Sequence, residues 1–326
     1  MNINVTVNQM LTLFFVLVVG YAARKLKIMS DMTDRLLSKL VVNITVPCTI
    51  ILAIVDGADG ISGGEGALFL LICAAVYAIS LLLAFFAPRL LRGGIKDSGL
   101  VSFMMAFGNV AFMGFPVCQA IFGSESMFYV ALFNIPFTLL VYSVGIVMVS
   151  GGQASGAVSP QAEQPAVGSA KRPRAGGFGL RLLLNPSFVS AVAAVALFAF
   201  KLRLPGIVSG GVEIISKMTT PSAMLIIGSS LAPVSPRAVF AEWRLYFIAF
   251  VKLAVIPAAI WFIMRLFVHD ALPLGVLTVL AGMPAATSAP MLAYEYGGNT
   301  AFASGGVFLT TLLSVATIPL LTYFLL

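Results

Sequence analysis

Long apolar runs separated by short polar segments fill almost the whole chain. Ten such runs lie near residues 8–22, 36–55, 67–87, 99–122, 127–149, 187–204, 207–231, 245–268, 272–293 and 301–325. Each is about as long as the ~20 residues that an α-helix needs to cross a bilayer. The pattern therefore predicts an all-α integral membrane protein with ten transmembrane helices.

Helix-breaking residues recur along these runs at a fixed distance. Four pairs are separated by 174 residues without a gap: Pro47 and Pro221, Gly108 and Gly282, Pro116 and Pro290, and Gly123 and Gly297. Each half of the chain then holds five predicted helices, and because five is odd, the second half must enter the membrane from the opposite side. We therefore predict two inverted five-helix repeats, over 1–149 and 185–326, an organisation found in many secondary transporters.

The one long polar segment, residues 150–184, is rich in Gly, Ser, Ala, Gln and Pro. Such a composition cannot build a packed core, so we expect a flexible linker between the halves. Thirteen of the 19 basic residues fall in this linker or in the other loops that follow odd-numbered helices. The positive-inside rule then places the linker in the cytoplasm and both termini outside the cell membrane.

Composition excludes several classes of function. Hydrophobic residues make up 60% of the chain and charged residues 10%, and the net charge of +7 reflects the basic loops. No basic patch is interleaved with exposed aromatics, so we expect no nucleic-acid partner. The three cysteines and the single histidine, His269, lack the spacing of a metal site, and no catalytic constellation is visible. We expect no cofactor, no metal and no enzymatic activity.

The candidate binding site lies at the paired Gly-x7-Pro segments of the fourth and ninth helices. A break there exposes half-helix N-termini, whose free N–H groups and positive dipole ends attract anions. Asn109 lies beside the first break, and Thr287 and Ser288 lie inside the second. Packing geometry is the alternative explanation for a single kinked helix, but two breaks in register favour a site.

Polar residues also flank the second proline pair, which we predict to break the second and seventh helices. Asn43 precedes Pro47, while Lys217 and Thr219 precede Pro221 and Ser222 follows it. A charged residue inside a membrane helix costs at least ~2.5 kcal/mol, so Lys217 should face a cavity or a partner. A lysine there suits a carboxylate substrate. The alternative is a salt bridge to Glu213, four residues earlier, near the outer surface.

Two further polar residues leave alternatives open. Asn134, in the fifth helix, either lines the cavity or packs between helices. Lys252, in the eighth helix, either snorkels toward the cytoplasm or has a function. Acidic residues fall in loops or near helix ends, so no acid-rich proton relay is visible. Backbone carbonyls at the breaks remain candidate ligands for a cation.

Four segments together resemble the auxin efflux carrier family: LVVNITVPCTII, FGNVAFMGFPVCQAIFG, KMTTPSAMLIIGSSLA and LAGMPAATSAPMLAYEYGGNT. The resemblance implies a bile-acid-symporter-like elevator fold, in which the broken fourth and ninth helices cross within a mobile domain. It also implies a scaffold of the first, second, sixth and seventh helices, through which a homodimer forms. Asn109, Pro116 and Pro290 would lie at the crossing, where the family binds a carboxylate. Met283 stands at the ninth-helix equivalent of Asn109, which implies an asymmetric site.

The function expected from these observations is secondary transport of a small mono- or dicarboxylate through the lipid bilayer. The short linker resembles that of prokaryotic members assigned to malonate or malate. We expect replacement of Lys217 or Asn109 to abolish transport. The alternatives are a sodium-coupled symporter of the bile-acid type and, from another class, a channel or ligand sensor. Sodium dependence and counterflow separate these three.

Overall fold

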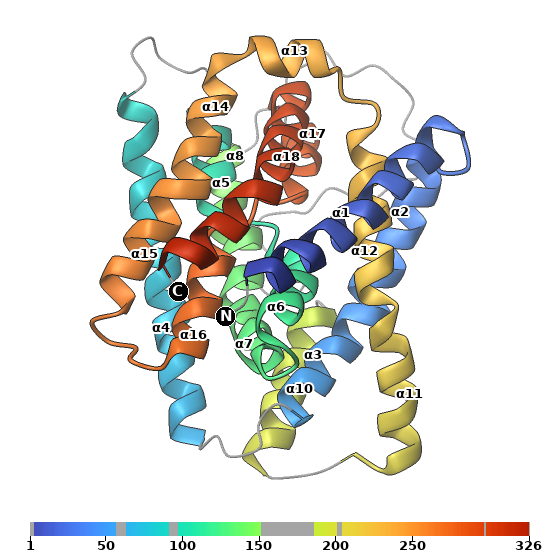
Figure 1. The fold of residues 1–326 in the computed structure, drawn as a ribbon, viewed down its shortest axis with the longest axis vertical. Helices are drawn as coiled ribbons and strands as arrows, with labels where there is room; N and C mark the ends of the chain where they lie inside the picture. The colour runs from blue at the N-terminus through green and yellow to red at the C-terminus, as the bar shows by residue number, and fades with distance from the viewer. Residues whose placement is uncertain are drawn as a thin grey trace.

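The computed structural model describes residues 3–56, 63–90, 97–150, 186–200, 204–296 and 298–325, and every regular element within them is a helix (Figure 1). All but Ser150 of the predicted linker 150–184 lies outside the described residues. The prediction of an all-helical protein is confirmed.

The helices of the first half follow the order of its apolar runs. The chain begins with α1 (Ile3–Lys25), then α2 (Asp31–Leu40), which continues through the π-helical turn η1 (Val41–Thr45) into α3 (Val46–Asp56). Next come α4 (Gly63–Phe86), its 3-10 extension η2 (Ala87–Leu90), α5 (Ser98–Ala106), the π turn η3 (Val110–Gly114) and α6 (Phe115–Phe122). The half ends with α7 (Ser126–Leu140), η4 (Val141–Gly145) and α8 (Ile146–Val149).

The second half has a matching series of elements. It contains α10 (Pro186–Ala199), α11 (Gly206–Lys217), α12 (Thr219–Leu231), α13 (Pro236–Ala241), α14 (Trp243–Phe250), η5 (Val251–Val255), α15 (Ile256–Met264), α16 (Ala271–Ala281), α17 (Ser288–Tyr296) and α18 (Thr300–Leu325). When α5 is moved by 174 residues it covers 272–280, within α16, and α6 moved likewise covers 289–296, within α17.

Five helical segments of the described residues are long and apolar enough to cross a membrane: 31–55, 64–89, 126–149, 243–264 and 300–325. The sequence predicts ten crossing helices, and several of the other stretches are divided into shorter helices. The fourth stretch is split into α5 and α6, the seventh into α11 and α12, and the ninth into α16 and α17. Interrupted helices of this kind need protein around them, because their free backbone groups cannot face lipid.

The predicted break at Pro47 is not present. The helix runs through from Asp31 to Val55, and the π turn η1 ends two residues before the proline. Proline lacks an N–H and therefore cannot bond to the preceding turn, and a wide turn accommodates that loss without ending the helix. In the second half, α11 ends at Lys217 and α12 begins at Thr219, so Pro221 lies in the first turn of α12.

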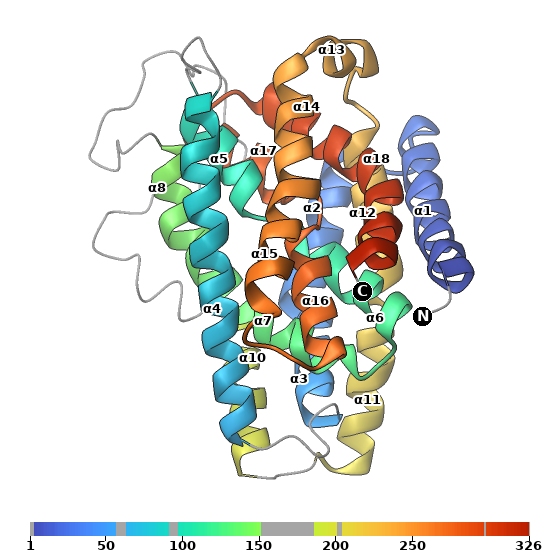
Figure 2. The same cartoon turned by 60° about the vertical axis from the view of Figure 1, so that its left-hand side comes forward.

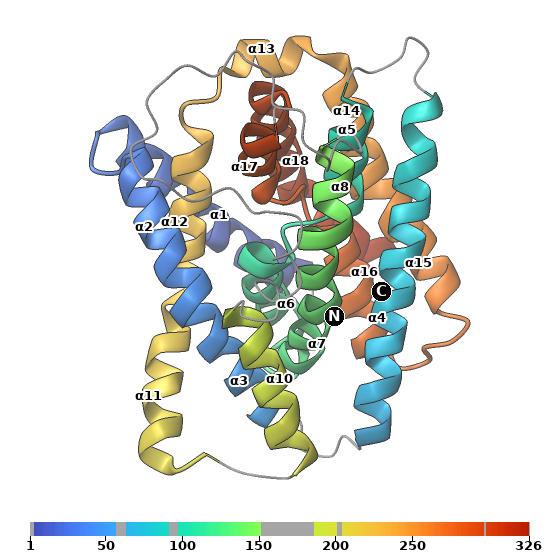
Figure 3. The ribbon, with the colours of Figure 1, turned by 180° about the vertical axis from the view of Figure 1, so that it is seen from behind.

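The helices pack as two groups (Figures 1 and 2). In the first, here called the α1–α12 bundle, α1 packs along α12, α3 packs against α10 and α11, and α2 packs against α12. The second, the α4–α18 bundle, contains α4–α8 and α14–α18. In Figure 3, seen from behind, α10 lies between α3 and α7, and it contacts both.

The α1–α12 contact is a contact of backbones. A Cβ placed on Gly228 would lie 1.9 Å from the Leu17 carbonyl oxygen, and one on Gly20 would lie 2.3 Å from that of Leu225. Close approach through small residues is typical of helix packing inside membranes. Nearby, the Ser229 hydroxyl donates to Asp34 at 2.7 Å, which ties α12 to α2. The geometry makes this helix pair rigid.

Candidate functional site: a junction between two broken helices

Two non-helical segments meet in the α4–α18 bundle. Residues 107–109 separate α5 from η3, and residues 282–287 separate α16 from α17. Gly108 and Ala285 form an isolated antiparallel bridge. The backbone N–H of Asn109 donates to the Pro284 carbonyl at 2.7 Å, and the backbone N–H of Ala286 donates to the Phe107 carbonyl at 3.0 Å. We call these two hydrogen-bonded segments the junction.

Side chains from other helices of the α4–α18 bundle bond to backbone groups at the junction. The Ala285 amide donates to the Thr310 hydroxyl of α18 at 3.1 Å, and that hydroxyl donates to the Gly306 carbonyl at 2.7 Å. The ammonium of Lys252, in η5, donates to the Ala281 carbonyl at the end of α16, at 3.0 Å. The junction is thus held from two sides by side chains of uninterrupted helices.

The prolines of the two breaks lie where helices tolerate them. Pro116 occupies the first turn of α6, and Pro290 occupies the first turn of α17. The N–H groups of a first turn have no partner within their own helix, so Pro290 loses nothing at its position. Pro116 directly follows the π turn η3, and the wide turn accommodates its missing N–H, as η1 does for Pro47. The backbone turns at the glycine end of each segment, and helical structure resumes before the proline, at Val110 in the first half and at Ser288 in the second.

The two breaks differ in length because only the first has a π turn. The first half resumes helical structure at Val110, whereas the second remains non-helical as far as Thr287. The bridge therefore pairs Gly108 with Ala285, three residues beyond Gly282, its equivalent at the 174-residue offset. The junction is asymmetric in its backbone as well as in its side chains.

Two polar side chains near the junction are buried without a hydrogen-bond partner among the described residues. They are the amide nitrogen of Asn109, a residue only 2% exposed, and the hydroxyl of Ser288. A buried donor without a partner costs about 1–3 kcal/mol. Asn109 begins the half-helix that continues into α6, and Ser288 begins α17, so both lie at half-helix N-termini. These positions favour an anion.

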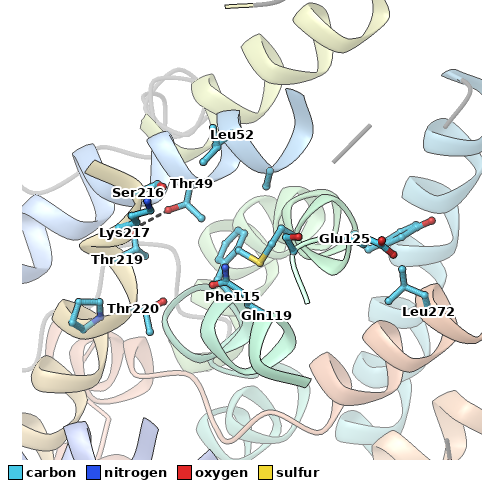
Figure 4. A pocket seen from close by; sticks show the side chains of 15 residues that line it. Thr49, Leu52, Phe115, Gln119, Glu125, Ser216, Lys217, Thr219, Thr220 and Leu272 are labelled. Atoms are coloured by element: carbon cyan, nitrogen blue, oxygen red, sulfur yellow. Dashed lines mark hydrogen bonds between the residues drawn. The ribbon is translucent and has the colours of Figure 1, made fainter. Parts of the chain in front are cut away.

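An open cleft of about 800 Å³ lies between the two bundles (Figure 4). The α1–α12 bundle lines it with Thr49, Ser216, Lys217, Thr219 and Thr220, and the α4–α18 bundle lines it with Phe115, Gln119, Glu125, Tyr129 and Leu272, among others. The Thr49 and Thr219 hydroxyls are 2.8 Å apart and hydrogen-bonded across α3 and α12. Phe115 and Gln119 belong to α6, so the cleft reaches the half-helix that follows the first break.

Lys217 lines this cleft and also has the ion pair that its spacing allows. Its ammonium is 2.8 Å from the Glu213 carboxylate, and its side chain is 70% exposed. The salt bridge to Glu213 is therefore the arrangement that the structure has. An exposed lysine does not need a partner to compensate for burial. The only observation that favours an anion-binding role for Lys217 is therefore its position in the cleft lining.

The remaining candidates are dispersed. Asn43 is exposed, and its side-chain amide donates to the Lys39 carbonyl of its own helix. Asn134 is buried in α7, and its amide donates to the Val130 carbonyl. Ser222 is buried in α12, outside the cleft lining. Thr287 and Pro290 lie at the junction and the start of α17, both partly buried.

Sequence reasoning missed Thr310 and did not connect Lys252 with the junction. Thr310 stands in an uninterrupted helix, where nothing local marks it. Lys252 carried a visible signal, a charge inside an apolar run, but the structure does not have it snorkelling, because the residue is 1% exposed. A buried charge needs oxygen ligands, and a broken helix end supplies them.

Comparison with known proteins places the chain in a family. The family model described as "Membrane transport protein" matches residues 5–322. A putative malonate transporter of Rhizobium meliloti is 25% identical over 77% of this chain and 72% of its own length. Uncharacterized transporters of Methanothermobacter thermautotrophicus and Methanocaldococcus jannaschii are 24% and 23% identical, over 95% and 97% of both chains. The chain belongs to the membrane transport protein family of the auxin efflux carriers and is a multi-pass membrane transporter, not an enzyme.

Proposed function

We propose that this protein is a secondary active transporter of small organic anions, such as malonate or malate, and that the junction binds the substrate carboxylate. The observation that carries the proposal is the buried, unpartnered side-chain amide of Asn109 at a half-helix N-terminus. A carboxylate there would accept from this amide and from first-turn N–H groups, and would meet the positive end of the helix dipole. The hydroxyl of Ser288, in α17, offers a second hydrogen-bond donor.

Alternating access would come from movement of the α4–α18 bundle against the α1–α12 bundle. The backbone contact at Gly20 and Gly228 supports a rigid α1–α12 scaffold, and the cleft between the bundles supports a path for substrate. Helix contacts in the two halves are also related by the 174-residue offset. The α1–α12 contact corresponds to the α10–α3 contact, and the α4–α5 contact corresponds to the α15–α16 contact. That correspondence supports an inverted repeat and an elevator-like cycle.

The proposed orientation places α13 and the α1–α2 turn in the cytoplasm. These two elements lie at the same end of the molecule in Figure 1, and the sequence around them carries basic residues such as Arg24 and Arg237. The end of α10 and the start of α11 lie at the other end. Basic residues concentrate on cytoplasmic loops, so both termini would lie outside.

The substrate class is argued from the chemistry of the cleft and junction together with the relatives. A volume of about 800 Å³ is within the range of small-molecule sites, ~300–1,000 Å³, and the cleft offers hydroxyl, amide and ammonium donors. The relative from Rhizobium meliloti is named a putative malonate transporter. The first substrate to test is therefore the short dicarboxylate malonate, followed by malate and a monocarboxylate.

Uptake into proteoliposomes tests this proposal. Purified protein should take up labelled malonate, malate or a monocarboxylate saturably, and unlabelled substrate inside the vesicles should accelerate uptake by counterflow. A channel gives flux without counterflow, and a ligand sensor gives binding without flux. Absence of saturable flux for all three anions would contradict the proposed function.

Lys217→Ala should weaken transport through substrate capture. The ammonium is exposed in the cleft, so it raises the local concentration of anions without forming the closed site. We expect KM to rise several-fold at low ionic strength, kcat to stay nearly unchanged, and the difference from wild type to shrink as salt is added. Initial uptake rates at two salt concentrations measure this. A large fall in kcat would instead place Lys217 in the bound complex.

A further inference from the structure

Lys252 is the most deeply buried charged residue among the described residues. It is 1% exposed, and among the described residues it is the only charged side chain below 9%. It belongs to the π turn η5, in the middle of the helix formed by α14 and α15. Its ammonium therefore lies inside the α4–α18 bundle, away from either membrane surface.

The ammonium lies where the end of α16 meets both segments of the junction. It donates to the carbonyl of Ala281, the last residue of α16. A Cβ placed on Gly108 would lie 3.2 Å from the ammonium nitrogen and 3.3 Å from the Met283 carbonyl oxygen. Gly108 thus gives the ammonium room to reach the backbone at this point.

No carboxylate balances this charge in the helices around it. The helices packed against η5 are α5, α14, α15 and α18, and Lys252 bonds to α16, and none of these five contains Asp or Glu. An unpaired ion in a protein interior costs several kcal/mol, so carbonyl dipoles must compensate for it. The end of a helix is suited to this because its last carbonyls are unpaired and carry partial negative charge.

Carbonyls at half-helix C-terminal ends and unwound segments are also the groups that hold coupling cations in carriers with broken helices. We propose that the junction contains a cation site and that the ammonium of Lys252 fills it as a covalently attached cation, in the place of a metal ion. The carrier then needs no sodium to complete its junction. The two halves contribute different groups: the first supplies Asn109, and the second supplies Lys252, whose equivalent in the first half is Ala78.

Thermal unfolding of the purified, detergent-solubilised protein tests the site directly. Wild type should melt at the same temperature in sodium chloride and in choline chloride of equal ionic strength, because its site is already filled. Lys252→Ala should melt at a lower temperature, and sodium or methylammonium should raise that temperature saturably while choline, which is too large, should not. Lys252→Met is the matched control, since its side chain fills the space without charge, and its melting temperature should respond to none of these ions.

Three results would overturn the inference. One is a saturable stabilisation of wild type by sodium over choline, which would mean a separate metal site. The second is a folded Lys252→Ala protein that responds to no small cation, and the third is a Lys252→Met protein that responds as Lys252→Ala does. If Lys252→Ala does not fold, a saturable stabilisation of wild type or of Lys252→Met by sodium over choline would still overturn the inference.

A flux measurement extends the test and is the only part that rests on the proposed function. Uptake by wild-type proteoliposomes should have the same rate and KM when sodium is replaced by choline. Uptake that disappears without sodium would refute the inference. Absence of uptake under every condition would refute the proposed transport of these anions while the unfolding measurements still stand.

Discussion

Asn109→Ala is expected to abolish most transport while leaving the protein folded. The variant removes the amide that the junction offers to a carboxylate, and a hydrogen bond to a charged group contributes about 1.5–3 kcal/mol. Substrate affinity should therefore fall by about 10- to 100-fold. Uptake in proteoliposomes over a wide range of substrate concentration measures the loss.

The same substitution should cost little stability. The Asn109 amide nitrogen is buried without a partner in the described structure, so its removal relieves a desolvation cost that offsets the lost packing. We expect the melting temperature without substrate to stay close to that of wild type, and stabilisation by substrate to disappear. A collapse in stability would indicate that Asn109 supports the fold rather than the substrate.

Two further asparagine variants make the result specific. Asn109→Asp keeps the size of the side chain but places an acid beside the expected carboxylate, so it should lose more activity than Asn109→Ala. Asn43→Ala removes an exposed amide that donates to its own helix, and its flux should stay within about twofold of wild type. Equal losses in Asn43→Ala and Asn109→Ala would contradict the assignment of the site to the junction.

Gly228→Ala is expected to give the largest loss of stability. Its new Cβ would lie 1.9 Å from the Leu17 carbonyl oxygen and 2.8 Å from the Tyr21 nitrogen, both backbone atoms that cannot move without their helix. Overpacking costs about 1–3 kcal/mol where side chains can adjust, and here the whole of α1 must shift. We expect a cost of about 3 kcal/mol or more, seen as a lower melting temperature or as loss of monodisperse protein.

Gly210→Ala is the matched control for that experiment. Gly210 lies in α11 of the same bundle, and a Cβ placed there meets nothing within 4 Å. Alanine at an open helical position stabilises by about 0.4–1 kcal/mol because it restricts the unfolded chain. Similar melting temperatures for Gly228→Ala and Gly210→Ala would show that α1 and α12 do not form a rigid contact.

The breaks of the fourth and ninth runs were predictable because Gly and Pro act locally. Proline lacks an N–H and glycine lacks a side chain, so each alters the local backbone conformation whatever its tertiary surroundings. The same Gly-x7-Pro spacing occurs in both halves. Pro47 follows the same rule and yet gives no break. Its neighbours absorb the missing hydrogen bond in the π turn η1, a choice that depends on packing around the helix.

The register of the junction and the side chains that bond to it could not be predicted from local sequence patterns. The bridge between Gly108 and Ala285 depends on the extra π turn in one half, which no spacing in the sequence marks. The contact between Lys252 and the Ala281 carbonyl joins residues 29 apart on different helices. Such contacts depend on how helices are arranged in space, whereas the Lys217–Glu213 pair follows from a spacing of four within one helix.

The two lysines have different proposed roles. Lys217 is exposed in the cleft, where we propose that it attracts the substrate, whereas Lys252 is buried beside the junction, where we propose that it takes the place of a metal ion. The proposed donor to the substrate is the uncharged side-chain amide of Asn109. This division explains how an anion site can exist in apolar helices that carry few charges.

Equilibrium binding of labelled malonate to the purified protein, with malate and monocarboxylates as competitors, tests the central claim most directly. Wild type, Asn109→Asp and Lys217→Ala are compared under the same salt conditions. We predict saturable binding to wild type, weaker binding to Lys217→Ala whose difference from wild type shrinks as salt is added, and none to a folded Asn109→Asp. Unchanged binding to folded Asn109→Asp would contradict the claim that the junction holds the substrate carboxylate.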